Sequence, residues 1–249
     1  MNDRYPHKLQ QTEADVGVDP GIFTGTLNGA ILGGSLNALL CAEGAYIKRA
    51  NKHSIIANEG SAQQGLIAVL NGMVKLSTSF RDGRTQIVGL RFPGEFITLL
   101  TQAEPWFARV EVVEDAALLV LGAEKTEKLR LESRQFNIDM SSHANREIGW
   151  ALAHLVTLGR KSPIERLASL LIELNDRGMG VNDASGEIRI PISRGEIGDY
   201  IGLESETVSR QFTRLKSDGY ISLLSPSRVV VRDWHSLAHL SNGGSIAAE

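Results

Sequence analysis

Cysteine and long apolar runs are scarce in this sequence, and their scarcity excludes two classes of protein. One cysteine, Cys41, occurs among 249 residues, so no disulfide can form within the chain, which indicates a reducing compartment. The longest clear apolar run, Ala116 to Leu121, falls far short of the roughly 20 residues that a transmembrane helix needs. The polar segment from Met1 to Asp19 lacks the apolar centre of a secretory signal. We therefore expect a cytoplasmic protein that does not bind a membrane.

An excess of positive charge is also missing. The formal net charge is −3 at pH 7, so total charge does not indicate nucleic-acid binding, and such a function has to be argued from a local site. Hydrophobic residues make up 42% of the chain and charged residues 22%, which is enough for packed cores and excludes a disordered or collagen-like chain. At roughly 150 residues per domain, this length corresponds to one or two domains.

Motifs of several common enzyme classes are absent as well. No Gly-x-x-x-x-Gly-Lys loop, zinc-protease helix or Gly-x-Ser-x-Gly elbow occurs, so we expect no enzymatic activity. His235 and His239 have the i, i+4 spacing that can hold a metal ion on a helix, but no acidic partner or third ligand lies nearby in the sequence. We therefore expect no metal site and no cofactor.

Short apolar runs punctuated by glycine fill the segment from Leu36 to Leu121. The expected strands are Tyr46-Ile47, Ser54 to Ile56, Leu66 to Leu70, Val74 to Leu76, Gln86 to Leu90 and Ala116 to Leu121. Turns are expected at Glu59-Gly60, Asn71-Gly72, Asp82-Gly83 and Pro93-Gly94, because glycine and asparagine accept the positive φ of hairpin turns. The spacing predicts an antiparallel barrel or roll over residues 36–123, after an N-terminal arm over residues 1–35.

Residues 124–160 differ in composition from the preceding segment, because glycine is rare and charged residues are mixed with apolar ones. This pattern predicts a helical region. One set of apolar residues recurs every three or four positions, as in the seam of a coiled coil, and consists of Ala144, Ile148, Ala151, Leu155 and Leu158. Two heptads fit a helix packed on its own domain as well as a helix that pairs with a second chain, so both interpretations stay open.

Residues 161–249 predict a compact unit of helices and strands. Ser162 can cap a helix, Pro163 suits the first helical position, and Glu165 completes a capping box. The helix is expected to end by Gly178, because glycine ends helices readily, and a strand is expected over Ile188 to Ile192.

The segment that follows is the most informative part of the sequence. A helix over Arg194 to Ile201, a turn at Gly202 and a second helix over Ser205 to Ser217 form the pattern of a helix-turn-helix. Strands over Tyr220 to Leu224 and Arg228 to Arg232 would form a hairpin immediately afterwards. A helix-turn-helix followed by such a hairpin predicts a winged DNA-binding module.

The second of these helices has one face made of polar residues. Glu206, Ser209, Arg210 and Thr213 recur at i, i+3, i+4 and i+7, so they share that face. An arginine can bind guanine O6 and N7 with two hydrogen bonds, and a glutamate can accept one from cytosine N4. The same residue types occur on an ordinary solvated helix, but the predicted hairpin favours the interpretation that this face reads DNA.

The segment Ser205-Glu206-Thr207-Val208-Ser209-Arg210 resembles the recognition helix of the CRP/FNR family of bacterial transcription regulators, and its Glu-x-x-Ser-Arg pattern is similar to the FixK-like branch. Leu158 to Ser162, followed by Glu165 to Ala168, resembles the same branch, and the glycine turns between residues 59 and 96 resemble a cyclic-nucleotide-binding β-roll. The resemblance covers about Leu36 to Val231. It implies an α+β fold with an N-terminal double-stranded β-roll, a long dimerisation helix and a C-terminal winged helix-turn-helix.

The resemblance also implies a function. A homodimer would bind double-stranded DNA and place one recognition helix in each half-site of a palindrome, with the half-sites about one helical turn apart. By this resemblance, the residues that read a TTGAT-like half-site are Glu206, Ser209 and Arg210. Contacts to phosphates, which set the register without reading sequence, are expected from Ser193, Arg194, Thr207, Thr213 and Arg228. Contacts with RNA polymerase are expected from the family alone.

The predicted β-roll departs from relatives that bind an effector. The iron–sulfur cluster of FNR needs four thiolates, and one cysteine excludes it. Where catabolite activator proteins bind a cyclic phosphate with an Arg-Ser pair, this chain has Trp106-Phe107, which cannot neutralise a phosphate. Glu95 matches a family position that often faces the ribose. Glu95, Trp106 and Phe107 are therefore the candidates for a small-molecule pocket, with turn structure and core packing as their alternative roles.

Two hypotheses for regulation follow. In the FixK-like one, the dimer binds DNA without a ligand and control lies in the amount of protein. In the alternative, a small molecule in the β-roll switches DNA binding on. Cys41 is interpreted as a small buried apolar residue rather than a redox switch, and His53 as a surface or hydrogen-bonded residue rather than a haem ligand. Binding of the ligand-free protein to DNA distinguishes the two hypotheses.

Overall fold

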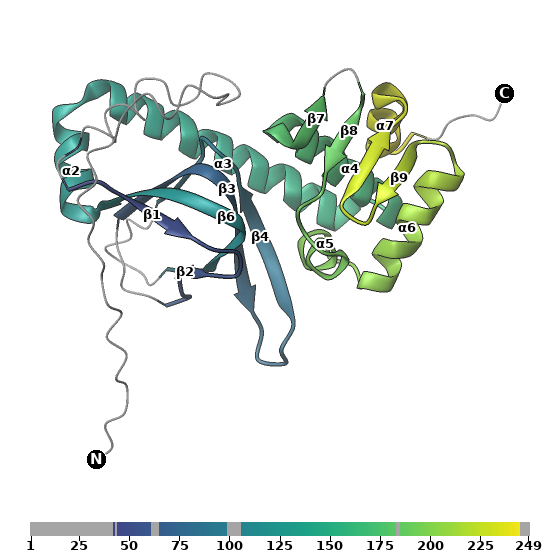
Figure 1. Ribbon diagram of the computed structural model, residues 1–249, viewed down its shortest axis with the longest axis horizontal. Helices are drawn as coiled ribbons and strands as arrows, with labels where there is room; N and C mark the ends of the chain where they lie inside the picture. The colour runs from purple at the N-terminus through teal and green to yellow at the C-terminus, as the bar shows by residue number, and fades with distance from the viewer. Residues whose placement is uncertain (1–41, 43, 61–64, 99–105, 183–184, 245–249) are drawn as a thin grey trace, which may run out of the picture.

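The computed structural model describes residues 42, 44–60, 65–98, 106–182 and 185–244, and Cys41 therefore lies outside the described residues. One long helix, α3 (Arg134–Arg160), runs past two folded parts of the chain, a sheet formed by residues before it and a mixed unit formed by residues after it (Figure 1). This arrangement confirms the predicted α+β fold with an N-terminal β-roll and a C-terminal winged helix-turn-helix.

The β-roll is an antiparallel sheet of six strands built around one long pair. Its strands are β1 (Tyr46–Ala50), β2 (Ile55–Ala57), β3 (Gly65–Ser79), β4 (Thr85–Arg91), β5 (Phe96–Thr98) and β6 (Arg109–Gly122). They follow the order β1-β6-β3-β4, with β2 paired to β6 and β5 paired to β3. Ile67, Val69, Val110 and Leu118 belong to the cluster of buried apolar side chains inside the roll.

The predicted turn at Asn71-Gly72 is wrong. The two strands expected on either side of it form the single strand β3, and its pairing with β6 shifts register between Val69 and Val74. The Asn71 side-chain oxygen accepts a hydrogen bond from the Ala117 amide at 3.2 Å, and Gly72 has a φ of +80°. The Asn-Gly pair therefore makes a bulge, which bends a long strand without reversing it.

Other turns behave as their sequences predict. Asp82-Gly83 connects β3 and β4, with the Phe80 amide bonded to the Arg84 carbonyl at 2.8 Å. At Pro93-Gly94, which joins β4 to β5, the glycine has a φ of +91°. Strand β6 begins at Arg109 rather than at the predicted Ala116, because the carboxylates among its first residues interrupt the apolar pattern that the prediction used.

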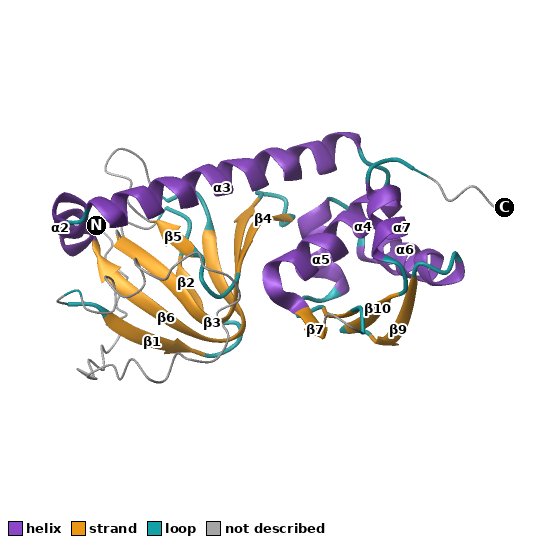
Figure 2. Ribbon diagram, turned by 90° about the horizontal axis from the view of Figure 1, so that it is seen from above, coloured by secondary structure: helices purple, strands orange, loops and turns teal. Residues whose placement is uncertain are grey.

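The helical region after the roll consists of two helices. Helix α2 (Ala123–Glu132) ends before Ser133, whose hydroxyl caps α3 by accepting a hydrogen bond from the Phe136 amide at 3.2 Å. Phe136 is fully buried against the roll and fixes the start of α3 there. Figure 2 shows both folded parts on the same side of α3. No helix within the described ranges is both long and apolar enough to cross a membrane.

The winged-helix part contains four helices, a short irregular helical turn and a four-stranded sheet. Its elements are α4 (Pro163–Leu174), η2 (Asn175–Met179), β7 (Gly180–Asn182), β8 (Glu187–Arg189), α5 (Arg194–Ile201), α6 (Ser205–Ser217), β9 (Ile221–Ser225), β10 (Arg228–Val231) and α7 (Trp234–Ser241). The predicted capping box is confirmed, because the Ser162 amide donates to the Glu165 carboxylate at 2.8 Å. The strands have the order β7-β8-β10-β9 and are all antiparallel.

One cluster of buried apolar side chains joins the two folded parts. Ile87, Leu90 and Phe92 from β4 and the turn after it pack in the same cluster as buried residues of α4, α5 and α6. Strand β4 lies directly beside α5. The position of the helix-turn-helix is therefore set by packing against the roll as well as by the chain connection through α3.

We expect Gly72→Ala to lower the free energy of unfolding by about 3 kcal/mol, since the backbone is left-handed there and the added Cβ would lie 2.4 Å from the Asp115 carbonyl oxygen. Gly83→Ala is the matched control, because φ is +86° but no atom lies within 4 Å of the new Cβ. The control should lose about 1 kcal/mol. Urea denaturation followed by tryptophan fluorescence measures both, and equal losses would contradict the bulge.

Candidate nucleic-acid interface

Helix α5 begins with a complete capping box. The Ser193 hydroxyl accepts a hydrogen bond from the Glu196 amide at 3.2 Å, and the Glu196 carboxylate accepts one from the Ser193 amide at 2.8 Å. The helix ends at Gly202, which has a φ of +67°. Gly198 allows the turn to close, because a Cβ there would lie 2.2 Å from the Leu203 carbonyl oxygen. The predicted helix-turn-helix is thus confirmed, and glycines at two positions give it its tight turn.

Helix α6 has one buried and one exposed face. Val208, Phe212 and Leu215 are buried in the core. The residues predicted to face DNA are exposed on the opposite side, and they are Glu206, Ser209, Arg210 and Thr213. The apolar face therefore fixes the helix, and the polar face is free to meet a ligand.

Hydrogen bonds on α6 order the exposed side chains. The Arg210 guanidinium donates to the Thr207 hydroxyl at 3.1 Å, so half-buried Thr207 limits the directions in which this arginine points. The hydroxyls of Ser209 and Thr213 donate to backbone carbonyls one turn earlier, at 3.0 and 3.2 Å. Each of these hydroxyl oxygens still has lone pairs that can accept a hydrogen bond from a base or a water molecule.

Arg194 is a cation without an ion-pair partner among the described residues. Its guanidinium lies over the Phe212 ring, 3.4 Å from the centroid, and one of its nitrogens is buried without a hydrogen-bond partner in that part of the chain. Burial lowers the pKa of Arg194 to about 10, so the side chain stays charged at neutral pH. A half-buried and unpaired arginine at the start of α5 suits a DNA phosphate.

The remaining phosphate candidates have partners of their own. Ser193 is exposed, but its hydroxyl already caps α5. Arg228, at the start of β10, pairs with Glu187 of β8, so part of its charge is neutralised within the protein. Of the two arginines in this set, Arg194 is therefore the one without an ion-pair partner among the described residues.

Two cations that the sequence did not single out support the helix-turn-helix. The Arg166 guanidinium donates to the carbonyls of Ile201 and Gly202 at 3.1 and 3.2 Å and so caps the end of α5. Lys75 of β3 contacts Glu196 at 2.6 Å and Glu111 of β6 at 3.3 Å. Burial raises the pKa of Glu196, but hydrogen bonds from Lys75 and Ser193 outweigh burial, so its pKa is lowered and the carboxylate stays ionised.

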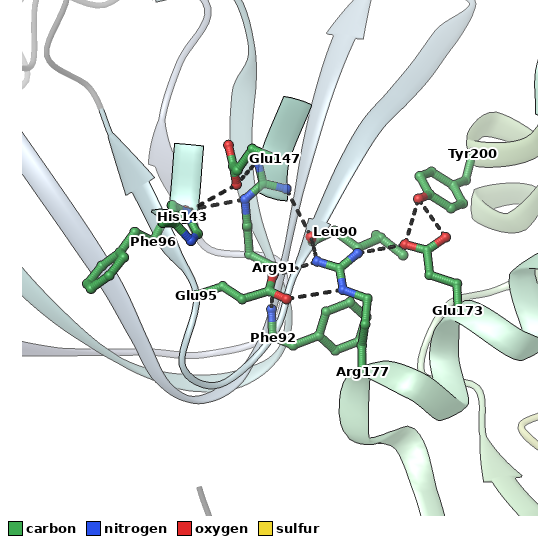
Figure 3. Close-up of polar contacts among 10 residues, drawn as sticks. All are labelled: Leu90, Arg91, Phe92, Glu95, Phe96, His143, Glu147, Glu173, Arg177 and Tyr200. Atoms are coloured by element: carbon green, nitrogen blue, oxygen red, sulfur yellow. Dashed lines mark hydrogen bonds and ion pairs between the residues drawn. The ribbon is translucent and has the colours of Figure 1, made fainter. Parts of the chain in front are cut away.

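The three residues proposed for a small-molecule pocket differ in how far they are buried. Glu95 is buried, and its carboxylate accepts hydrogen bonds from the Phe92 amide and from Arg177 of η2 (Figure 3). Trp106 packs in the core of the roll, whereas Phe107 is 59% exposed. Glu95 is therefore occupied by the protein's own arginine, and the rings of Trp106 and Phe107 pack against each other with centroids 4.9 Å apart, so the small-molecule pocket stays a prediction.

The predicted apolar seam on α3 is largely uncovered. Leu155 is 69% exposed and Ile148 is 58% exposed. Ala144 and Ala151 are exposed as well. Leu158 differs, since it is half-buried and lies against the turn at Gly202. Of the two interpretations that the sequence left open, the helix packed only on its own domain does not account for this exposed side.

The histidines have structural surroundings. The ring of His53 is exposed and lies 3.4 Å from the Glu111 carboxylate. His143 of α3 is buried, where its ring nitrogen contacts the Phe96 carbonyl at 3.2 Å. No group of three or more metal-ligating side chains is found within the described ranges.

Comparisons with known proteins agree with this geometry. Residues 165–240 match the Crp-like helix-turn-helix domain, and residues 47–133 match the cyclic nucleotide-binding domain. The nitrogen fixation regulation protein FixK of Bradyrhizobium diazoefficiens is 34% identical over 168 residues, which cover 65% of this chain and 70% of that protein. FixK of Azorhizobium caulinodans is 32% identical over 198 residues, which cover 77% of each chain.

A solved structure supports the same assignment. The structure of FixK2 from Bradyrhizobium japonicum superposes with a TM-score of 0.72 at 27% sequence identity, and the match covers 82% of this chain and 99% of that one. Two domain families and two FixK relatives thus agree with the β-roll and the winged helix-turn-helix that the structure shows. The chain belongs to the CRP/FNR family of DNA-binding transcriptional regulators, near its FixK branch, and is not an enzyme.

Proposed function

We propose that the protein acts as a homodimer that binds a palindromic TTGAT-like site, with Glu206, Ser209 and Arg210 of each chain reading bases. The observation that carries this proposal is the polar face of α6, which is exposed while the opposite face is buried. A helix of this kind fits the major groove of DNA. The phosphate contacts are assigned to Ser193, Arg194, Thr207, Thr213 and Arg228.

The exposed side of α3 supports the dimer. Leu152 is 59% exposed and Val156 is 54% exposed, so they extend the apolar surface formed by Ile148 and Leu155. Both folded parts lie on the other side of α3, which leaves this side open to a second copy (Figure 2). Pairing two such helices would bury the apolar side chains and would fix the distance between two α6 helices.

The surroundings of Glu95 favour DNA binding without an effector. In the effector-dependent alternative, a small molecule would have to compete with Arg177 for this carboxylate. Relatives of this chain include proteins named as transcriptional activators, such as FnrA of Stutzerimonas stutzeri. We infer a cytoplasmic regulator that contacts RNA polymerase at promoters, since it binds DNA and activation of transcription requires the polymerase.

The proposal is tested by fluorescence anisotropy of the purified, ligand-free protein on a TTGAT-NNNN-ATCAA duplex. A scrambled duplex at the same salt concentration is the control, because phosphate contacts alone bind both. Tight binding to the matched duplex alone supports an effector-independent regulator. Equal affinity for the two duplexes would contradict the proposed site or the ligand-free mode of action.

We expect Arg210→Ala to weaken binding to the matched duplex by about 1–3 kcal/mol per half-site, because a base contact is lost. Affinity for the scrambled duplex should change little. Arg130→Ala is the matched control, since Arg130 is another exposed helical arginine. It lies on α2, which directly follows the β-roll and is outside the winged-helix part. If Arg210→Ala bound the matched duplex as tightly as the parent, the assigned role of this residue would be wrong.

Arg194→Gln should weaken the matched and scrambled duplexes by similar factors. A phosphate contact carries no sequence information, so its loss lowers the slope of log affinity against log salt by about 1 per half-site. Arg194→Lys keeps the charge and should retain most of the slope. Titrations at several salt concentrations measure the effect, and a loss confined to the matched duplex would instead assign Arg194 to base reading.

Leu155→Glu should weaken dimerisation at least about 100-fold, because it introduces a charge in the middle of an apolar interface. Sedimentation velocity at micromolar protein reports the change from dimer to monomer. Leu131→Glu is the control, since Leu131 lies on α2 and is 87% exposed outside the α3 surface. If the Leu155→Glu variant remained a dimer, the two chains would pair through another surface.

A further inference from the structure

A buried arginine of the winged-helix part reaches into the β-roll. Arg177 lies in η2, directly after α4, and its side chain is only 8% exposed. The following residue, Gly178, has a φ of +89°, so the chain turns sharply there. Arginine is seldom buried without partners, and its surroundings therefore indicate what it does.

The Arg177 guanidinium is bound to carboxylates from both folded parts (Figure 3). Its Nη2 atom lies 2.5 Å from the Glu95 carboxylate, which belongs to the turn between β4 and β5, and Nε donates to the same carboxylate at 3.1 Å. Nη2 also donates to the Leu90 carbonyl at 2.7 Å. Nη1 donates to Glu173 of α4 at 2.6 Å. The pair of bonds to Glu95 is the two-pronged arrangement that only arginine can make.

Aromatic rings enclose the same guanidinium. The Phe92 ring centroid lies 4.3 Å away and the Trp150 ring centroid lies 4.4 Å away. Phe92 belongs to the roll and Trp150 to α3, so Arg177 contacts the roll, the long helix and the winged-helix part at once. Burial would lower the pKa of Arg177, but Glu95 and Glu173 outweigh burial, and the group stays charged.

The contacts extend to the first helix of the helix-turn-helix. Glu173 accepts a hydrogen bond from the Tyr200 hydroxyl at 2.9 Å, and Tyr200 belongs to α5. The backbone carbonyl of Tyr200 accepts a hydrogen bond from the Gln86 side chain of β4 at 3.1 Å. A chain of direct contacts thus runs from Glu95 through Arg177 and Glu173 to α5, and α5 is joined to α6 by the tight turn at Gly202.

We propose that Arg177 is a positioning residue that sets the direction in which α6 is presented to DNA, with Glu95 as its anchor on the roll. This proposal rests on the proposed function, since it assumes that two α6 helices meet two half-sites. A firmly held α6 accepts one separation of half-sites and rejects others. If the anchor is lost, the winged-helix part can tilt, and the dimer then discriminates less between palindromes with different spacers.

Three variants and a control test the proposal. Arg177→Met keeps the packing against the two rings but removes every hydrogen bond of the guanidinium. Glu95→Gln removes the negative charge that anchors Arg177 on the roll. The double variant combines both substitutions, so neither the Arg177 charge nor the Glu95 charge remains buried without its partner. Arg189→Met is the matched control, because Arg189 also pairs across the two parts, with Glu114, but its side chain is 45% exposed. Solvent screens such a pair, so little should depend on it.

The first readout is the ratio of affinities for TTGAT palindromes with four-base and five-base spacers. We expect Arg177→Met and Glu95→Gln each to lower this ratio about tenfold, and the double variant to be no worse than Arg177→Met, since the two residues act as one unit. Arg189→Met should stay within about twofold of the parent. A ratio unchanged in both single variants would overturn the proposal.

The second readout needs no DNA. Hydrogen–deuterium exchange of the free protein should become about tenfold faster in the turn between β4 and β5 and in α5 for Arg177→Met and Glu95→Gln, while β3 and β6 stay protected. Unchanged exchange in both variants would also overturn the proposal. If the parent protein failed to prefer the matched duplex, the proposed function would be wrong, and the exchange measurement would still decide whether Arg177 holds the two parts together.

Discussion

Apolar side chains of the β-roll and of the winged-helix part meet in one shared cluster, and the position of the recognition helix depends on it. Leu90 and Phe92 pack in the same cluster as Leu171, Tyr200 and Phe212, which come from three different helices. Protein interiors are close-packed and hardly compressible, so a displacement of one packed element is passed on to its neighbours. The polar face of α6 is therefore placed by contacts that begin in the sheet, some 100 residues earlier in the sequence, and not by the helix-turn-helix alone.

Charged groups refine the placement that the core provides. Arg177 and Lys75 each link a carboxylate of the roll to one of the winged-helix part, and both side chains are largely buried. Burying ions costs free energy, so such pairs add little net stability. Their attraction offsets this cost only when the charged groups are well aligned, so other arrangements of the two parts are disfavoured. Arg189–Glu114 spans the same boundary near the surface, where screening weakens it. Apolar packing thus supplies most of the attraction between the parts, and the two buried cations select one orientation.

The local features of this fold could be predicted from sequence, whereas the contacts between its parts could not. Capping boxes and glycine turns are signals within a few residues, which is why the helix-turn-helix, the Asp82-Gly83 hairpin and the α+β organisation were predicted correctly. The turn predicted at Asn71-Gly72 is wrong because a bulge and a hairpin turn use the same residue types. Only the pairing with the partner strand decides between them. The pairing of Arg177 with Glu95 joins residues 82 positions apart, and neither belongs to a motif that indicates the other. The sequence alone therefore makes Glu95 a pocket candidate.

The distribution of charge explains how a chain with a net charge of −3 can bind DNA. Many of its carboxylates are paired with cations inside the protein, and these are Glu95, Glu111, Glu114, Glu147, Glu173, Glu187 and Glu196. Helix α6 carries Arg210, Arg214 and Lys216 against the carboxylate of Glu206, and Arg214 is paired with Asp218 directly after the helix. The field that a phosphate meets falls off within about 10 Å at ordinary salt, so charges close to the phosphate decide the interaction and the distant carboxylates do not. The ion pairs between the roll and the winged-helix part therefore neutralise carboxylates within the protein, and the net charge of the whole chain does not decide whether α6 can meet DNA.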